Sequence, residues 1–303
     1  MKFRQISSLF VFLFLIVSCE DNDSISNSTD PIFEGSGLYT FNYTKTNGEI
    51  NMRIFFHVPL GDVQNMPVLF VFHGASRNPN DYRNEWIAEA NEKQVIVVVP
   101  EFSNTNFPGG DGYNLGNVFV DGDNPSLATL NPEQDWAFSI IEPLFDDIKS
   151  KTGNNSSRYD VFGFSAGSQF AHRFLMFKPE ARINQVVASA AGWYTVPDET
   201  VTFPYGIADC PIENNTNYDY FSKRMTLQIG TLDNNPNASA LRRNDIVDQQ
   251  GTNRYDRAFY MFNTSQARAQ SLGVNFNWEI IETPNNAHNS GQSVPQASDV
   301  LYE

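Results

Sequence analysis

The chain has 303 residues, 41% of them hydrophobic, which is enough for one sizeable core and a single globular domain. Its formal net charge is −15, and outside the N-terminus the sequence contains no run of Lys and Arg. Because binding to a phosphate backbone requires clustered cations, these features argue against a nucleic-acid partner. The excess of acidic residues suits a protein that stays soluble outside the cell.

The first 18 residues have the pattern of an export signal. Lys2 and Arg4 give a positively charged start, and residues 9–17 form an apolar run too short to span a bilayer comfortably. The run ends in Ile-Val-Ser-Cys, which resembles a bacterial lipobox, a motif whose cysteine becomes the lipidated first residue after cleavage. We therefore predict a lipoprotein signal peptide over 1–18 and a lipid anchor at Cys19, in the outer membrane or at the cell surface. An ordinary secretory signal cut nearby is the alternative.

Residues 19–34 are predicted to form a flexible acidic tether. The segment is mostly polar and has no periodicity. It resembles the acidic stretches that send lipoproteins of Bacteroidota to the cell surface. With Cys19 committed to lipid, Cys210 has no disulfide partner, and two cysteines cannot build a cysteine-based metal cluster. We expect Cys210 to be a small apolar residue in or near the core.

The folded domain, predicted over 35–303, begins with a hairpin and continues as alternating strands and helices. Apolar and polar residues alternate on both sides of the Asn47-Gly48 turn, whereas several later strands are continuous apolar runs, as in strands buried on both faces. The predicted strands are 38–45, 51–59, 67–72, 94–99, 158–162, 185–191, 225–229 and 275–282, and the predicted helices are 136–149, 166–177 and about 265–272. This order indicates an α/β fold with a mostly parallel central sheet, helices on both faces and an antiparallel N-terminal hairpin. Residues 103–133 are predicted to be a long functional loop.

A G-x-S-x-G motif at 163–167 makes Ser165 the candidate nucleophile. The motif follows a predicted strand and precedes a predicted helix, which is the context that a nucleophile turn requires. Small residues two positions before and after the serine let the strand and the helix approach closely. The turn pushes the hydroxyl out of the sheet, at a helix N-terminus whose dipole favours developing negative charge.

Elimination among the four histidines leaves His288 as the candidate general base. His57 lies inside a predicted strand, and His73 ends another. His172 lies on the same helix as Ser165, roughly 10 Å further along its axis, and is expected to be a packed helix residue. His288 lies in a loop of small polar residues after the last predicted strand, from which it can reach the serine hydroxyl.

The acid that orients the imidazole is expected between the serine and the histidine in the chain, the order typical of nucleophile turns on such sheets. Asp233 follows a buried-looking strand through a tight Gly-Thr-Leu segment, and catalytic residues in such sheets lie beyond the carboxyl ends of the strands. We therefore favour Asp233. Asp198 is the main competitor, because it follows the preceding strand.

Two backbone N–H groups are needed to form an oxyanion hole for the developing negative charge. Ala166, the residue after the nucleophile, supplies one of them. The second is expected from Ala75, in the loop after the strand that ends at Phe72, where a glycine and a small neighbour leave room. His73 is then a structural residue of that loop.

With these residues in place, the chain resembles the α/β-hydrolase superfamily. It looks most like the exported esterases that include polyhydroxybutyrate depolymerases and feruloyl or acetylxylan esterases. The resemblance rests on motifs at 71–75, 163–167, 230–233 and 287–288, spread over roughly residues 51–290. It implies an α/β-hydrolase fold and acyl transfer to water through an acyl-enzyme, without a metal or an organic cofactor.

The expected activity is that of an exported serine esterase acting on carboxylic esters of an acylated polysaccharide or a polyester. Aromatic residues in loops near the catalytic edge suggest an aromatic-lined cleft, with Trp193 and Tyr194 as substrate-binding residues. The aromatic set is Phe102, Phe107, Tyr113, Trp193, Tyr194 and Tyr205. A peptidase or amidase on the same fold and a non-catalytic, glycan-binding surface lipoprotein are the alternatives. The sequence gives no indication of the oligomeric state.

Overall fold

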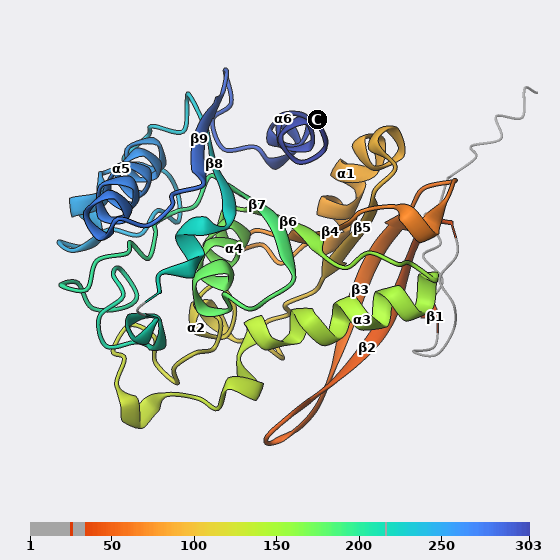
Figure 1. The fold of residues 1–303 in the computed structure, drawn as a ribbon, viewed down its shortest axis with the longest axis horizontal. Helices are drawn as coiled ribbons and strands as arrows, with labels where there is room; N and C mark the ends of the chain where they lie inside the picture. The colour runs from red at the N-terminus through yellow and green to blue at the C-terminus, as the bar shows by residue number, and fades with distance from the viewer. Residues whose placement is uncertain (1–24, 27–33, 216) are drawn as a thin grey trace, which may run out of the picture.

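The computed structural model describes residues 25–26 and 34–303, except Thr216. The predicted signal peptide, the lipid attachment at Cys19 and all of the predicted tether but residues 25–26 and 34 lie outside the described residues. Within the described part, a nine-stranded mixed sheet runs through the molecule in the order β1-β2-β3-β5-β4-β6-β7-β8-β9 (Figure 1).

The predicted hairpin is confirmed and is longer than expected. β2 (Gly35–Lys45) and β3 (Gly48–Val58) pair antiparallel along their whole length, from Gly35 opposite Val58 to Lys45 opposite Gly48. The short β1 (Ile25–Ser26) adds a parallel strand beside β2, and β3 pairs antiparallel with β5. The hairpin thus lies near one end of the sheet, with β1 as the outermost strand.

The remaining strands pair parallel with one another, as predicted from their apolar runs. They are β4 (Val68–Phe72), β5 (Ile96–Pro100), β6 (Tyr159–Phe164), β7 (Ile183–Ser189), β8 (Arg224–Gly230) and β9 (Trp278–Thr283). Every residue of β4, β5 and β6 is buried, because helices cover both faces. The carboxyl ends of these strands meet at one edge of the sheet, which is where sites in such folds form.

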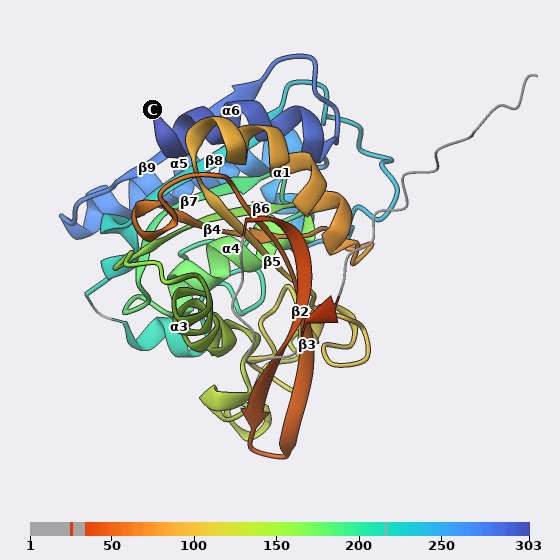
Figure 2. The same ribbon diagram turned by 90° about the vertical axis from the view of Figure 1, so that its right-hand side faces the viewer.

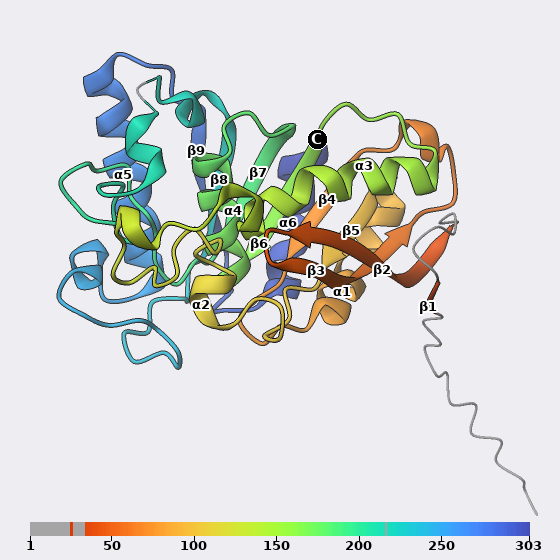
Figure 3. The same cartoon turned by 90° about the horizontal axis from the view of Figure 1, so that it is seen from below.

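Helices lie on both faces of the sheet. They are α1 (Pro79–Lys93), α2 (Gly109–Gly112), α3 (Ile141–Thr152), α4 (Ala166–Phe177), α5 (Arg254–Leu272) and α6 (Ser290–Tyr302). α1 and α6 pack against each other on one face, and α3 and α4 lie on the opposite face (Figures 2 and 3). α5 packs against β8 and β9. None of the described helices combines the length and the apolar character needed to cross a membrane.

The loops contain short 3-10 helices. They are η1 (Val63–Asn65), η2 (Leu127–Thr129), η3 (Glu133–Asp135), η4 (Ala137–Ile140), η5 (Pro211–Asn214), η6 (Asp219–Ser222) and η7 (Val247–Gln250). The helix predicted over 136–149 is therefore divided into η4 and α3. The predicted loop at 103–133 is mostly irregular, as expected, and contains α2, η2, an isolated bridge between Phe119 and Leu130, and the first residue of η3.

Three helices, α1, the four-residue α2 and α6, were not predicted, and α5 starts well before the predicted 265. α1 buries Arg83 together with Tyr82 and Trp86, so its buried face is not an apolar stripe. α6 contains Pro295, a residue that normally argues against a helix. Its buried face is also largely small or polar, which hides the helical period.

Aromatic rings fill the core between β4 and α4. Phe72 and Phe170 have ring centroids 4.5 Å apart, and Phe102 lies 4.9 Å from Phe170 and 4.8 Å from Tyr113. Such pairs contribute about 0.5–1.5 kcal/mol beyond the area they bury. They hold the end of β4 firmly against α4, the helix that begins after Ser165. Cys210 is buried, as predicted, and burial raises the pKa of its thiol to about 12.

Candidate active site

Ser165 lies at a sharp turn between β6 and α4, with φ 56° and ψ −113°. This backbone conformation is unfavourable for a residue that carries a Cβ. Glycine is required on both sides of the turn. A Cβ on Gly163 would lie 2.2 Å from the carbonyl oxygen of Gly167, and a Cβ on Gly167 would lie 1.9 Å from that of Phe72. The turn therefore brings helix and strand into backbone contact and leaves the Ser165 side chain partly exposed.

Three of the predicted residues form one hydrogen-bonded chain. Ser165 Oγ lies 3.2 Å from His288 Nε2, and His288 Nδ1 lies 2.6 Å from Asp233 Oδ2. The three residues come from separate elements, namely the start of α4, the loop after β8 and the loop between β9 and α6. The histidine ring also packs against the ring of Phe164, with centroids 4.8 Å apart. The arrangement has the connectivity of a nucleophile, a base and an orienting acid.

Of the two candidate acids, Asp233 is the one in contact with the histidine. Its side chain is 4% exposed, and its second oxygen, Oδ1, lies 3.2 Å from Arg254 Nη1. The Asp198 carboxylate instead accepts hydrogen bonds from the backbone N–H and the hydroxyl of Thr200, at 2.8 and 2.7 Å. The Asp198 carboxylate thus stabilises the local turn at Thr200 and has no contact with His288.

The other histidines near the site are buried and locally bonded. His73 Nδ1 lies 3.0 Å from the Gly74 carbonyl oxygen, and His73 Nε2 accepts from the backbone N–H of Phe102. Burial lowers the pKa of His73 to about 4, so the ring is neutral at neutral pH. His172 is fully buried inside the structure, and burial lowers its pKa as well. Both occupy structural positions, as the sequence suggested.

The loop over 73–77, here called the oxyanion loop, carries the predicted Ala75 next to the serine. A Cβ on Gly74 of this loop would be 3.8 Å from the Ser165 Cβ. Ala75 lines the same cavity as Ser165. Ala166 is the first residue of α4, and the N–H of a first helical residue has no partner within its helix. Both predicted donors therefore come from backbone close to the hydroxyl.

Arg77 ties the oxyanion loop to the long loop that follows β5. Its guanidinium donates to the carbonyl oxygens of Phe102, Phe107 and Gly109, the last at 2.7 Å. It also lies over the ring of Tyr113, whose hydroxyl donates to the carbonyl oxygen of His73 at 2.7 Å. The predicted long loop thus supports the backbone that carries Ala75.

Ser165 and His288 open into a cavity of about 360 Å³. One wall comes from the exposed side of α1 and includes two carboxylates. The other walls come from the α6 N-terminus and from the loop before α5. The lining includes Asp81, Tyr82, Glu85, Ser239, Arg254 and Ser290. The Ser290 hydroxyl donates to Glu85 at 2.9 Å, and burial raises the pKa of Glu85. Small and polar side chains dominate this cavity.

The expected aromatic cleft is not present at this cavity, and this part of the prediction is wrong. Trp193 is 4% exposed and lies between the guanidinium groups of Arg173 and Arg242, at 4.3 and 4.8 Å from its centroid. Tyr194 is fully buried, and its backbone is bonded to Gln250. All six aromatic residues proposed to line a cleft are at most 8% exposed. Their rings pack in the hydrophobic core, because the loops that carry them fold over α4.

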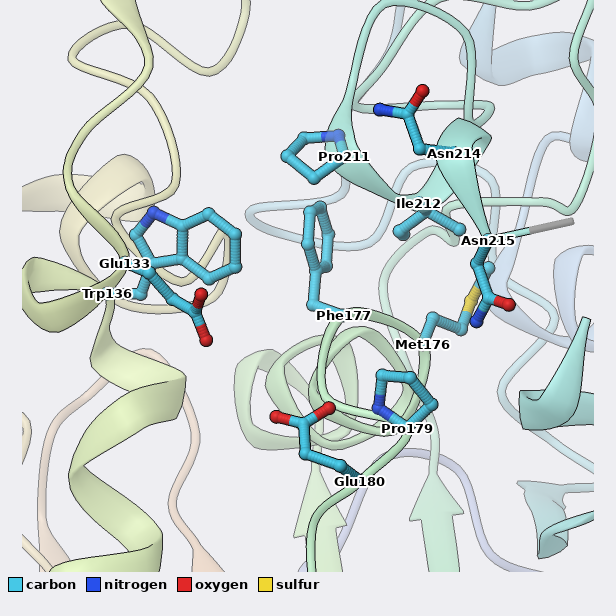
Figure 4. A pocket seen from close by; sticks show the side chains of 10 residues that line it. All are labelled: Glu133, Trp136, Met176, Phe177, Pro179, Glu180, Pro211, Ile212, Asn214 and Asn215. Atoms are coloured by element: carbon cyan, nitrogen blue, oxygen red, sulfur yellow. The ribbon is translucent and has the colours of Figure 1, made fainter. Parts of the chain in front are cut away.

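A larger cavity, of about 430 Å³, lies elsewhere, beside the end of α4 and η5 (Figure 4). Trp136, Phe177 and Pro211 face one another across it, with Glu133 and Glu180 at its rim. Its lining contains no serine, cysteine or histidine. Size alone therefore does not identify the reactive site. Among the described residues, no group of three or more His, Cys, Asp or Glu side chains is placed to hold a metal ion.

The sequence reasoning missed Arg254 and the wall formed by α1. Arg254 stands at the start of α5, whose N-cap, Asn253, accepts from the backbone N–H of Asp256. An Asn followed by an acidic residue in the first turn is a recognisable helix-start signal. That signal could have placed the beginning of α5. The contact between Arg254 and Asp233 could not have been found in this way.

Two solved structures share sequence with this chain over nearly its whole length. Poly(aspartic acid) hydrolase-1 from Sphingomonas sp. KT-1 is 33% identical, with a TM-score of 0.82, covering 90% of this chain and 100% of that one. LpqC, a poly(3-hydroxybutyrate) depolymerase from Bordetella parapertussis, is 26% identical, with a TM-score of 0.81, covering 89% and 90%. An S-formylglutathione hydrolase from Agrobacterium tumefaciens, at 16% identity and a TM-score of 0.53, covers 90% of this chain and 96% of its own, and shares the fold alone. No protein-family model and no curated protein sequence matches the chain.

Proposed function

Because the chain belongs to the α/β-hydrolase superfamily, we propose that it is an exported serine esterase with a Ser165-His288-Asp233 triad. The main support is the hydrogen-bonded chain from the Ser165 hydroxyl through the imidazole to the Asp233 carboxylate. No step of the proposed reaction needs a metal or an organic cofactor.

The reaction proceeds in two acyl transfers. Ser165 Oγ attacks the ester carbonyl while its proton passes to His288 Nε2, and the oxyanion that forms accepts hydrogen bonds from the N–H groups of Ala75 and Ala166. The C–O bond to the leaving alcohol then breaks, and the imidazolium returns the proton to that alcohol. Water attacks the acyl-enzyme by the same route, which releases the acid and restores the serine hydroxyl.

The substrate is proposed to be a polymeric ester, either an acylated polysaccharide or a polyester. Two relatives, at 33% and 26% identity, are named for polymers, poly(aspartic acid) and poly(3-hydroxybutyrate). In this chain Asp81 and Glu85 line the cavity beside the nucleophile. Two carboxylates at that position disfavour a polyanion through like-charge repulsion. A neutral polymer that offers hydroxyl groups or ester oxygens to small polar side chains fits this lining better.

The enzyme is proposed to act from the outer membrane or the cell surface, anchored through lipid on Cys19. The basis is the sequence of the first 34 residues alone. Metabolic labelling with an alkyne fatty acid tests the anchor. Label that persists in a Cys19→Ala variant, or that never enters the parental protein, contradicts it.

Fluorophosphonate labelling tests the nucleophile, and hydrolysis assays test the bond that is cleaved. We expect the parental protein to be labelled and the Ser165→Ala variant to be unlabelled. Turnover of p-nitrophenyl acetate and butyrate should exceed turnover of aminoacyl p-nitroanilides. The reverse preference would support the second candidate function, that of an amidase. This candidate is favoured by the 33% identity to a hydrolase of poly(aspartic acid), a polymer joined by amide bonds. A folded parental protein without any label would support a glycan-binding role instead.

A further inference from the structure

We propose that Arg254 is a positioning residue of this site, which holds the Asp233 carboxylate in the orientation that His288 requires. This inference rests on the proposed function. It assigns a role to a residue that belongs neither to the proposed triad nor to the oxyanion hole. Arg254 and Asp233 form a buried ion pair directly behind the acid's contact with His288.

The two oxygens of Asp233 have different partners. Oδ2 lies 2.6 Å from His288 Nδ1, and Oδ1 lies 3.2 Å from Arg254 Nη1. The side chains of Asp233 and Arg254 are only 4% and 7% exposed. A carboxylate that is buried to this degree needs a partner for each oxygen, because water does not solvate it. Arg254 supplies the second partner, and its contact prevents rotation of the carboxylate away from the imidazole.

The backbone makes this contact rigid. The N–H of Tyr255, the residue after Arg254, donates to the carbonyl oxygen of Asp233 at 3.1 Å. Asn253, the residue before it, caps α5 through a side-chain hydrogen bond from the N–H of Asp256. The start of α5 is therefore attached to Asp233 through both main chain and side chain. A 19-residue helix anchored in this way is a firm support for the acid.

Among the described residues, Arg254 is also the only Lys or Arg that lines the active-site cavity. The other charged groups there are Asp81 and Glu85, both on α1. Arg257, one turn further along α5, is bound to the carbonyl oxygens of Gly192 and Gly251 and to Asp248.

The remaining groups around His288 and Asp233 carry no charge at neutral pH. Ser165 and the Phe164 ring contact the imidazole, and Tyr194 faces Asp233 from the loop after β7. Burial raises the pKa of Tyr194, so the phenol stays neutral. The positive charge of Arg254 is therefore the one that the Asp233-His288 pair faces directly.

Two substitutions separate the geometric effect from the charge effect. Arg254→Gln removes both the guanidinium contact and its charge. We therefore expect kcat to fall about ten- to a hundred-fold with KM unchanged, which is the loss typical of residues that orient a catalytic group. The acid limb of the kcat/KM profile should also move to higher pH. Arg254→Lys keeps the positive charge but loses the planar guanidinium. The acid limb of the kcat/KM profile should therefore remain at the parental pH while kcat falls. Added guanidinium, at concentrations too low to unfold the protein, should restore activity to Arg254→Ala but not to Arg254→Lys.

Arg268→Gln is the matched control, because Arg268 is on the same helix and pairs with Glu199, away from the cavity. It should keep the parental kcat and acid limb. The proposal is wrong if Arg254→Gln retains both parental values, or if kcat falls without a shift of the acid limb and without rescue by guanidinium. Should Arg254→Gln fail to fold, a parental kcat in Arg254→Lys overturns the proposal. Fluorophosphonate labelling of the parental Ser165 tests the proposed function separately.

Discussion

Replacement of Ser165 by glycine should abolish activity and yet yield a more stable protein than replacement by alanine. Ser165 has φ 56° and ψ −113°, a conformation that disfavours any residue with a Cβ and that glycine adopts readily. Alanine keeps the Cβ and hence the strain. Both variants lose the hydroxyl and its hydrogen bond to His288, so this loss cancels when the two are compared.

The size of the effect follows from two opposing terms. Release of a strained backbone conformation contributes about 1–3 kcal/mol to the free energy of unfolding. The greater freedom of glycine in the unfolded chain removes about 0.5–1 kcal/mol of that gain. The glycine variant should therefore be more stable than the alanine variant by about 1 kcal/mol, and by at most about 2.5 kcal/mol, which corresponds to a rise in Tm of a few degrees for a domain of this size.

Thermal unfolding of the two variants at the same pH, followed by circular dichroism, measures this difference. Ser168, which lies within α4 and is fully buried, provides a matched control. There glycine should be less stable than alanine by about 1 kcal/mol, since helical backbone favours alanine. A Ser165→Gly variant that melts at or below the temperature of Ser165→Ala would refute the claim that the turn is strained.

Three further predictions concern the supports of the site. Burial lowers the pKa of His73 to about 4 in the folded protein, whereas the pKa of an ordinary histidine is about 6.5. As the pH falls between these two values, His73 therefore binds a proton in the unfolded chain but not in the folded protein. Stability should therefore decrease on acidification, by about 1.6 kcal/mol between pH 6.5 and pH 5 from this residue alone, and His73→Gln should make the free energy of unfolding in denaturant less dependent on pH across that range. Arg77→Ala should lower kcat about ten-fold in p-nitrophenyl acetate hydrolysis, since the oxyanion loop loses its bonds to three carbonyl groups; an unchanged kcat would exclude this support. Gly230→Ala places a Cβ 2.2 Å from a backbone oxygen in the loop that carries His288 and should remove most activity, whereas Gly291→Ala, with its nearest neighbour at 3.5 Å, should leave activity intact.

The features that the sequence by itself determined are those set by neighbouring residues. The turn at Ser165 could be recognised because its glycines are two positions away on either side, and the close backbone contacts at Gly163 and Gly167 exclude any larger residue. The parallel strands could be recognised because burial on both faces requires continuous apolar runs. His288 could be singled out because the chain has only four histidines and the other three lie in or beside regular elements.

Other features were decided only by the tertiary structure, because they depend on residues that are far apart in the sequence. Asp198 and Asp233 both follow strands, and only the folded loops show which carboxylate meets the imidazole. Whether Trp193 faces a cleft or the core depends on how its loop folds over α4. The pairing of Arg254 with Asp233 depends on the docking of α5 beside β8. Periodicity and local sterics can be read along a chain, but a contact between distant side chains exists only once the sheet has brought their loops to the same edge.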